Sequence, residues 1–399
     1  MMTQGGLSKE RILLIPFSGL GDLMMHLRLA EILKQDFEVD LVIDSLYEAV
    51  GNFLKEHRII SNFRLCRQSK NLLGLIRKAK LFLMEVEPRA YKHILIYDRP
   101  LFTMMSLLPR YRNAIRYTLL RKRLHGPKGI TSVEKNRNQT EAVLDFARSL
   151  SYPVNGMAYT FPPEVVAHCE ARAERWLSAS GDTHPRKRLI SVSPFATHPY
   201  KKAPDNLFTA VLRSLMRGGF CTIMIGSQQD IPAAEAFSRP FEGSPRFLNL
   251  VGKLSWEETI GILCQSRLFL CNDGGIMHVS LACRTKTVAF FGPTDPYTLV
   301  LKSNQHLQPV FLALPCQPCW QKGPMGRFRC PEVKKACLEY IATDQVINLI
   351  SGLLAAAPPD PVGVLPPEWN RRDLHTPEGG PPDPEEEASD GARAHGPIR

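Results

Sequence analysis

The sequence predicts an α/β fold of two domains, each built on a parallel sheet, that face a central cleft. Short apolar, β-branched segments alternate with longer helical segments, which is typical of stacked βαβ units. The 399 residues exceed the usual size of one domain, about 100 to 200 residues. The alternation also stops at residues 152–163, which hold three prolines and a glycine, and then starts again. A cleft between two such domains is the expected site.

The first domain is expected at residues 10–160. RILLIPF begins it as an apolar strand that leads into a helix, and HILIYD adds a later strand of the same sheet. The predicted strands are residues 11–17, 39–43 and 93–98, and the helix after the first strand is residues 23–34.

The second domain is expected at residues 186–342, after a linker and helix at residues 161–185. The linker holds a helical segment at residues 164–178 and ends in the loop SGDTHP. The predicted strands of this domain are residues 189–192, 221–225, 268–271 and 287–291. A final amphipathic helix is predicted at residues 343–356.

Residues 357–399 form a proline-rich acidic tail that is expected to be disordered. The tail has ten prolines and few apolar residues, so it cannot bury enough surface to fold. The chain carries a formal charge of +11, but residues 358–399 hold nine acidic and four basic residues, so the remainder carries +16. An excess of this size favours an anionic partner, either a phosphate-bearing molecule or a membrane surface.

Much of the positive charge lies in residues 110–128, RYRNAIRYTLLRKRLHGPK. This segment is either an exposed, solvated helix or a surface that holds the anionic partner. Nucleic acid is not expected, because the chain has neither a recognisable binding module nor an interleaved run of stacking aromatics.

A cytoplasmic protein is expected. No window offers about twenty uninterrupted apolar residues, and the opening MMTQGGLSKER lacks the apolar stretch of a signal peptide. The ten cysteines are therefore expected to be reduced.

The first predicted strand is followed by SGLGD, residues 18–22. Two glycines let the backbone turn tightly and approach a ligand, and Asp22 stands at the start of the helix, facing the cleft. Aspartate is also a favoured N-cap residue, and G-x-G without a third glycine is weak evidence for a dinucleotide site. Both a site role and a capping role for Asp22 are open at this point.

NDGGIMHVSLA, residues 272–282, follows a predicted strand of the second domain. Asp273 lies at the carboxyl end of the sheet, where open α/β sheets bind ligands. Gly274 and Gly275 leave the backbone unhindered, the first N–H groups of the next helix suit a phosphate, and His278 would lie beside it. The alternative is a tight turn with a histidine satisfied in the core. One aspartate and one histidine are an incomplete set of metal ligands.

Two further loops lie at the same edge of the predicted sheet. SPFATHPYKKAP, residues 193–204, carries the hydroxyl of Thr197 and the ammonium of Lys201, which suit a phosphate unless this is an ordinary basic surface loop. Asp230 follows the strand at residues 221–225 and either accepts from ribose hydroxyls or caps the next helix.

Four cysteines lie near the end of the second domain. Cys316 and Cys319 form a CxxC pair, and Cys330 and Cys337 follow without forming a second pair. This pattern leaves a structural zinc site open but does not favour it.

Together these motifs resemble glycosyltransferase family nine, the bacterial heptosyltransferases that build the lipopolysaccharide core. NDGGIMHVSLAC followed by TVAFFGPTDP is similar to the family signature N-D-S-G-x-x-H-x-A-A and its apolar strand ending in F-G-x-T-x-P. YKKAP resembles the K-x-W-P segment, CQPCW with a later Cys-Leu resembles a cysteine pattern of the heptosyltransferase II branch, and RILLIPFSGLGDLMMHLRLAEILK resembles the opening strand, turn and helix. The resemblance spans about residues 10 to 350.

The resemblance implies the GT-B fold, in which two Rossmann-like domains face a cleft, the first for the acceptor and the second for the nucleotide sugar. It implies inverting, metal-independent transfer, usually of heptose from ADP-heptose, to a lipopolysaccharide-core or related glycan, with no cofactor. Asp22 matches the proposed general base, Lys201 a phosphate-contacting lysine, and Asp230 falls near a ribose-binding carboxylate. The residues that match the diphosphate-binding turn are Asp273, Gly274, Gly275 and His278.

The acceptor side rests on charge. Arg110, Arg112 and Arg116 of the basic segment are expected to hold an anionic glycolipid or glycan, with peripheral contact at the cytoplasmic face of the inner membrane.

The sequence departs from the family pattern at four positions. Gly274 stands where serine is usual, and Ala203 stands where tryptophan is usual. His26 and Arg28 replace a threonine and a proline near the acceptor. These differences bear on the sugar and the acceptor more than on the type of reaction.

Three alternatives remain. One is a GT-B transferase that uses another nucleotide sugar and acceptor, and another is a non-catalytic nucleotide-sugar binding protein. A nicotinamide-dependent oxidoreductase is disfavoured, because residues 18–22 lack a complete G-x-G-x-x-G.

Overall fold

The computed structural model describes residues 9–16, 19–66, 76–77, 80–81, 83–96, 108–111, 115–117, 138–156, 158–179, 188–320, 330 and 335–355. The predicted disordered tail and most of the basic segment at residues 110–128 lie outside these ranges.

The first sheet is parallel and has the strand order β3-β2-β1-β4-β5. Its strands are β1 (Glu10–Ile15), β2 (Phe37–Ile43), β3 (Asn62–Leu65), β4 (His93–Ile96) and β5 (Ile115–Tyr117). Along β1, Ile12 and Leu14 join one buried apolar cluster while Leu13 and Ile15 join another. Both faces of the sheet are therefore covered, which is why β1 is apolar without alternation.

Helices and short 3₁₀ turns connect the strands of the first half. The helices are α1 (Leu20–Leu33), α2 (Glu48–Glu56) and α5 (Gln139–Ser149). The 3₁₀ turns are η1 (Ser45–Tyr47), η2 (Pro88–Ala90) and η3 (Pro109–Tyr111). Helix α1 packs against α5.

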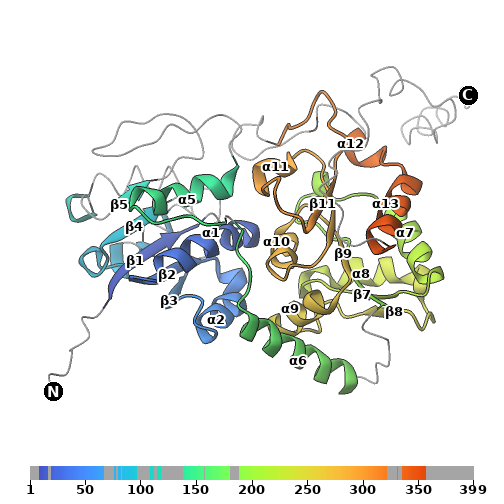
Figure 1. The fold of residues 1–399 in the computed structure, drawn as a ribbon, viewed down its shortest axis with the longest axis horizontal. Coiled ribbons are helices and arrows are strands. Elements are labelled where there is room, and N and C mark those ends of the chain that lie inside the picture. The colour runs from blue at the N-terminus through green and yellow to red at the C-terminus, as the bar shows by residue number, and fades with distance from the viewer. Residues whose placement is uncertain are drawn as a thin grey trace, which may run out of the picture. The chain divides into compact units, whose positions relative to one another are not determined.

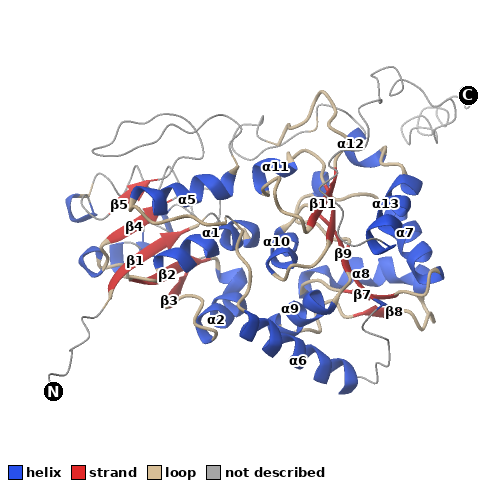
Figure 2. Ribbon diagram, viewed as in Figure 1, coloured by secondary structure: helices blue, strands red, loops and turns tan. Residues whose placement is uncertain are grey.

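The second sheet is also parallel and has the strand order β11-β10-β9-β6-β7-β8. Its strands are β6 (Leu189–Ser193), β7 (Cys221–Met224), β8 (Phe247–Asn249), β9 (Leu268–Asn272), β10 (Thr287–Phe290) and β11 (Leu307–Val310). Figure 2 shows the strands gathered in two separate groups with helices packed around each. The predicted fold of two parallel-sheet α/β domains is confirmed.

The helices of the second half are α7 (Asp205–Arg217), α8 (Ile231–Ser238), α9 (Trp256–Gln265), α10 (Gly275–Ala282), α11 (Pro296–Leu299), α12 (Ala336–Glu339) and α13 (Thr343–Ala355). The 3₁₀ turns are η5 (Pro199–Lys201), η6 (Gln228–Asp230) and η7 (Arg239–Phe241). Across the part of the chain that the structure describes, no helix combines the length and the apolar character that crossing a bilayer requires.

The predicted elements of both halves are present. The ends of the predicted strands and helices coincide with the observed ones or differ from them by at most three residues. The two sheets occupy residues 10–117 and 189–310 and so fall inside the two predicted domains, whose limits stay predictions.

The strand order places the candidate loops at two equivalent points. β1 lies between β2 and β4, and β6 lies between β7 and β9. In each sheet the strands are therefore added first on one side of the first strand and then on the other. Open α/β sheets bind ligands at the carboxyl end of such a switch point. The turn before α1 follows β1, and the loop with Lys201 and the turn with Asp273 follow β6 and β9.

Helix α6 (Pro163–Ala179) lies alongside α9 (Figure 1). A Cβ on Gly261 of α9 would lie 2.1 Å from the carbonyl oxygen of Cys169 in α6, so only glycine permits this approach. Residues of both sheets, such as Leu14 and Phe269, belong to one apolar cluster. The two halves are therefore packed together through a shared core.

Candidate functional site

The first turns of α1 and α10 meet, although the two helices follow strands of different sheets (Figure 1). A Cβ on Gly21 would lie 2.9 Å from Cδ2 of His278, and a Cβ on Gly275 would lie 2.6 Å from the Cβ of Leu20. Both glycines are thus needed for the contact between the helices. Leu20 occupies the space where a side chain on Gly275 would lie, whereas the corresponding space at Gly274 is open.

Lys201 and Asp273 form an ion pair at the carboxyl end of the second sheet. The Nζ atom of Lys201 lies 2.6 Å from Oδ2 of Asp273, and their side chains are 17% and 3% exposed. The same Nζ atom lies 4.7 Å from the ring centroid of Trp320, a cation–π contact. Because two groups hold it, the ammonium of Lys201 has a defined position beside the start of α10.

Asn272, the last residue of β9, holds the loop that carries Lys201. Its Oδ1 accepts from the N–H of Ala203 at 2.9 Å, and its Nδ2 donates to the carbonyls of Pro194 at 2.9 Å and Phe195 at 3.2 Å. Every end of the buried amide is bonded, as a buried polar group requires. Ala203 is itself 1% exposed, so this position belongs to the core of the loop.

Asp22 is the third residue of α1 and lies part-buried at its N-terminus. Its Oδ2 accepts from the N–H of Gly19 at 3.1 Å, so the capping role is present. A carboxylate has about four acceptor sites, so Asp22 can cap α1 and also accept from a ligand hydroxyl. Burial, together with the charges of Asp44 and Asp22, raises the pKa of Tyr47, which keeps this neighbouring phenol protonated.

His278 contacts Gly21, the residue before Asp22, and lies within the electrostatic reach of the ion pair. Burial lowers the pKa of His278 to about 4, the charge of Asp273 opposes this, and that of Lys201 adds to it. The imidazole is therefore neutral near pH 7 and offers a hydrogen bond rather than a charge.

The remaining predicted donor residues, Thr197 and Asp230, follow β6 and β7. Thr197 is exposed in the loop after β6. Asp230 caps its own turn, because its Oδ2 accepts from the N–H of Ser227 at 2.9 Å and from the Ser227 hydroxyl at 2.7 Å. The contact of Asp230 with a ribose stays a prediction.

The predicted acceptor residues are only partly within the described chain. Arg110 belongs to η3 and Arg116 to β5, and Arg112 lies outside the described residues. His26 and Arg28 are placed: His26 is 1% exposed inside α1, and Arg28 donates to the carbonyls of Asn155 at 2.6 Å and Gly156 at 3.2 Å. His26 therefore packs inside the fold, and Arg28 attaches the loop at residues 155–156 to α1.

The cysteines of the CxxC motif come together with the two later ones. Cys316, Cys319, Cys330 and Cys337 line one small pocket beside Tyr200, and none of the four forms a disulfide. Burial raises the pKa of Cys337 to about 12, and the neighbouring Cys330, Cys319 and Cys316 add to this. The question of a metal at these cysteines stays open.

Two features of the site were not predicted from the sequence. Trp320 lies far along the chain from Lys201. It reaches the site because its N–H group and that of Cys319 both bond to the carbonyl of Pro293. A pocket of about 50 Å³ lies beside His278, between Met24 and Met25 of α1 and Tyr159. A larger pocket of about 300 Å³ lies between α7 and α13 and is lined by none of the predicted site residues.

Adjacent glycines at the start of α10 are expected to respond differently to substitution. Gly274 has φ −161° and ψ 176°, an extended conformation open to any residue, and a Cβ there meets no atom closer than 3.8 Å. A serine would cap α10, so Gly274→Ser should change stability by only a few tenths of a kcal/mol, in the stabilising direction. Gly275→Ala should destabilise by about 1–3 kcal/mol, because its Cβ overlaps Leu20. Melting temperatures of the two variants compare them directly, and equal values would contradict the role given to Gly275.

The stability of the protein is expected to fall on mild acidification. Burial lowers the pKa of His26 to about 4, against a backbone hydrogen bond to Asp22 that raises it. The unfolded histidine takes up a proton below about pH 6.5 and the folded one only near pH 4, so protons favour the unfolded state within this window. His26 alone should account for about 2 kcal/mol of the loss between about pH 7.5 and about pH 5.

Urea unfolding of the wild type and of His26→Gln at these two pH values measures this contribution. Glutamine keeps a donor for the carbonyl of Asp22 but does not titrate, so the variant should lose less stability. An equal loss in both proteins would rule out His26 as the source.

Comparisons with known proteins agree with the geometry. A family model described as glycosyltransferase family 9 (heptosyltransferase) matches residues 107–325. The lipooligosaccharide heptosyltransferase 2 of Haemophilus ducreyi is 24% identical over 375 residues, covering 86% of this chain and 99% of the relative. The lipooligosaccharide heptosyltransferase 2 of Campylobacter jejuni is 37% identical over 107 residues, covering 26% of this chain and 32%, about a third, of that relative.

The fold has a solved counterpart. The structure of Escherichia coli ADP-heptose lps heptosyltransferase II matches with a TM-score of 0.59 and 15% identity, covering 86% of this chain and 98% of the other. The arrangement of the two sheets thus matches a known fold. Since the family model spans more than half of its residues, the chain belongs to glycosyltransferase family 9.

Proposed function

We propose that this protein is an inverting glycosyltransferase that moves a heptose from ADP-heptose to a lipopolysaccharide-core or related glycan acceptor. The contact between the first turns of α1 and α10 is the observation that carries the proposal. Through it, His278 contacts Gly21, the residue before Asp22, and lies within the electrostatic reach of the Lys201–Asp273 pair. Transfer needs a base and a stabiliser of the leaving group at one place.

The donor diphosphate is assigned to the N-terminus of α10. The first N–H groups of a helix have no partner within it and suit a phosphate. The ammonium of Lys201 has three N–H donors, of which Asp273 occupies one. The others are directed to the diphosphate, and Asp273 acts as a positioning residue for Lys201.

The acceptor hydroxyl is assigned to Asp22. In the proposed step the carboxylate takes the proton of the hydroxyl as its oxygen bonds to the anomeric carbon, and the bond from that carbon to the diphosphate breaks. Negative charge develops on the leaving diphosphate, where Lys201 and the α10 N–H groups stabilise it. The neutral His278 is suited to donate a hydrogen bond there. No metal ion has a role in this scheme.

The choice of donor and acceptor rests on the comparisons and on charge. The matched Escherichia coli structure is that of an ADP-heptose lps heptosyltransferase, and the Haemophilus ducreyi relative is a lipooligosaccharide heptosyltransferase. The charge of +16 outside the acidic tail suits a phosphorylated or carboxylated glycolipid. Peripheral contact with the cytoplasmic membrane surface, with the help of Arg110, Arg112 and Arg116, is part of the proposal.

A thermal-shift panel of ADP, UDP, GDP and their sugar nucleotides tests the donor. ADP and ADP-heptose are expected to raise the melting temperature selectively, since a ligand that binds only the folded state stabilises it. A preference for UDP or GDP would instead favour a transferase with another nucleotide sugar. Selective binding of ADP-heptose without product formation on any tested acceptor would favour the non-catalytic binding protein.

A further inference from the structure

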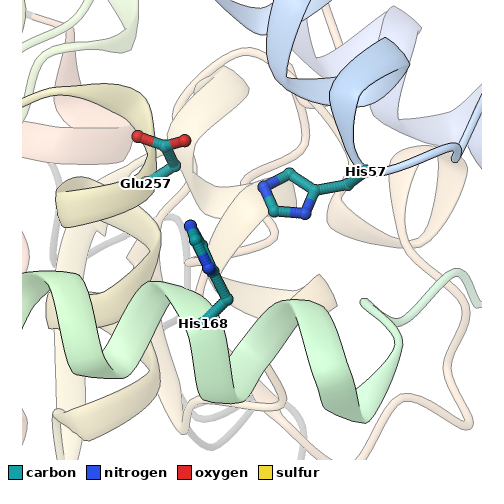
Figure 3. A group of neighbouring side chains, drawn as sticks. All are labelled: His57, His168 and Glu257. Carbon is teal, nitrogen blue, oxygen red and sulfur yellow. The ribbon is translucent and has the colours of Figure 1, made fainter.

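His57, His168 and Glu257 converge on one point outside the proposed transfer site. Each offers a ligand atom, and these atoms all lie within 4.8 Å of one another. Figure 3 shows the two imidazoles and the carboxylate directed toward a shared space. The three residues come from different parts of the fold: His57 directly follows α2, His168 lies within α6, and Glu257 lies in the first turn of α9.

Helix packing fixes this arrangement. Gly261 lies one turn after Glu257 in α9, and Cys169 follows His168 in α6; the two helices touch where Gly261 meets the carbonyl of Cys169. Helix α2 also packs against α9. The ring of His57 is held by Phe53, whose centroid lies 4.6 Å away. Because α6 and α9 carry His168 and Glu257 and the ring of His57 packs on Phe53 of α2, the cluster is pre-organised.

We infer that His57, His168 and Glu257 bind a divalent transition-metal ion of the zinc class. Imidazole and carboxylate are both common zinc ligands, and three protein ligands leave positions that water can complete. The rings of His57 and His168 lie with centroids 5.0 Å apart, close enough for both to face one ion. His168 is exposed, so an ion reaches the cluster from solvent.

A metal ion at the cluster would compete with Arg172 for the carboxylate of Glu257. Arg172 lies with Nε 3.5 Å from Oε2 of Glu257. Its side chain is 40% exposed, and an ion pair of this kind contributes little. An ion at the cluster therefore replaces a weak partner of Glu257.

The ion would join the two halves of the molecule. His57 belongs to the half with the first sheet, Glu257 to the half with the second, and His168 to the helix that follows the first half in the chain. The proposed role is structural: binding ties α2, α6 and α9 together. It is independent of the transfer chemistry, which involves none of these residues.

Calorimetric titration of the full-length, chelator-treated protein with Zn²⁺ tests the inference. The wild type is expected to bind one more Zn²⁺ per chain than His168→Gln or Glu257→Gln, or to bind it at least about tenfold more tightly. His306→Gln removes a part-buried imidazole elsewhere and should titrate like the wild type. Comparison between these variants also subtracts any ion held by the four clustered cysteines.

Melting temperatures complete the test. Zn²⁺ should raise the melting temperature of the wild type and of His306→Gln more than that of His168→Gln, whereas without metal the variants should melt alike because His168 is exposed. Equal stoichiometry and affinity in the wild type and in His168→Gln and Glu257→Gln would overturn the inference, as would a wild type that binds no Zn²⁺.

Discussion

Asp22→Asn is expected to reduce sugar transfer by about 10²- to 10⁴-fold, the usual contribution of a general base. Folding should be nearly unaffected, because the asparagine side-chain oxygen still accepts from the N–H of Gly19 as Asp22 does. The substitution thus removes the base and keeps the cap. Its effect should fall on turnover rather than on donor affinity, since the diphosphate is assigned to the other helix.

Product formation from ADP-heptose, calorimetric affinity for ADP and the melting temperature together test this expectation. Asp22→Ala is the matched control, because it removes both the base and the cap and should also lower the melting temperature. Near wild-type turnover in Asp22→Asn, with normal melting, would exclude Asp22 from the chemistry. If neither the wild type nor the variant forms product, the result would favour a non-catalytic binding protein.

Lys201→Ala is expected to weaken donor binding and to destabilise the fold at the same time. Asp273 is 3% exposed and its ion pair is with Lys201, so the substitution strands a buried carboxylate. Breaking a buried pair by removing one partner costs about 3–5 kcal/mol. A loss of activity in Lys201→Ala alone would therefore not separate binding from folding.

The double variant Lys201→Ala with Asp273→Asn makes the separation. It removes both charges, so most of the lost stability should return while the donor affinity stays low. Urea unfolding and ADP calorimetry on the wild type, both single variants and the double variant form a double-mutant cycle. Wild-type affinity for ADP in the double variant would remove Lys201 from the donor site.

The sequence predicted the centre of each sheet better than its edges. Buried strands such as β1 and β9 are apolar runs, whereas the edge strands β3, β5, β8 and β11 have three or four residues each and were not predicted. β3 and β8 are only part-buried or exposed, so their composition lacks the hydrophobic signal. An edge strand pairs with a neighbour on one side only, and backbone pairing does not show in the residue types of a short segment.

The site was predictable where its residues follow strands and unpredictable where loops fold back. Lys201 and Asp273 were expected at one edge of the second sheet because the ends of its parallel strands lie there, and the structure joins them in an ion pair. Trp320 and the cluster of His57, His168 and Glu257 depend on contacts between distant segments, which no local pattern encodes. Gly275 was expected to open the backbone to a ligand, but the structure fills its space with Leu20.

The amide of Asn272 has a consequence for chemical ageing of the protein. Its Nδ2 group donates to the carbonyls of Pro194 and Phe195, and its Oδ1 accepts from Ala203. Deamidation would convert the side chain into an acid of the same size whose oxygens face those two carbonyls with no proton to share. The loop with Lys201 would then lose its attachment to β9 without any change in bulk, so the support that Asn272 gives to the loop depends on one side-chain nitrogen atom.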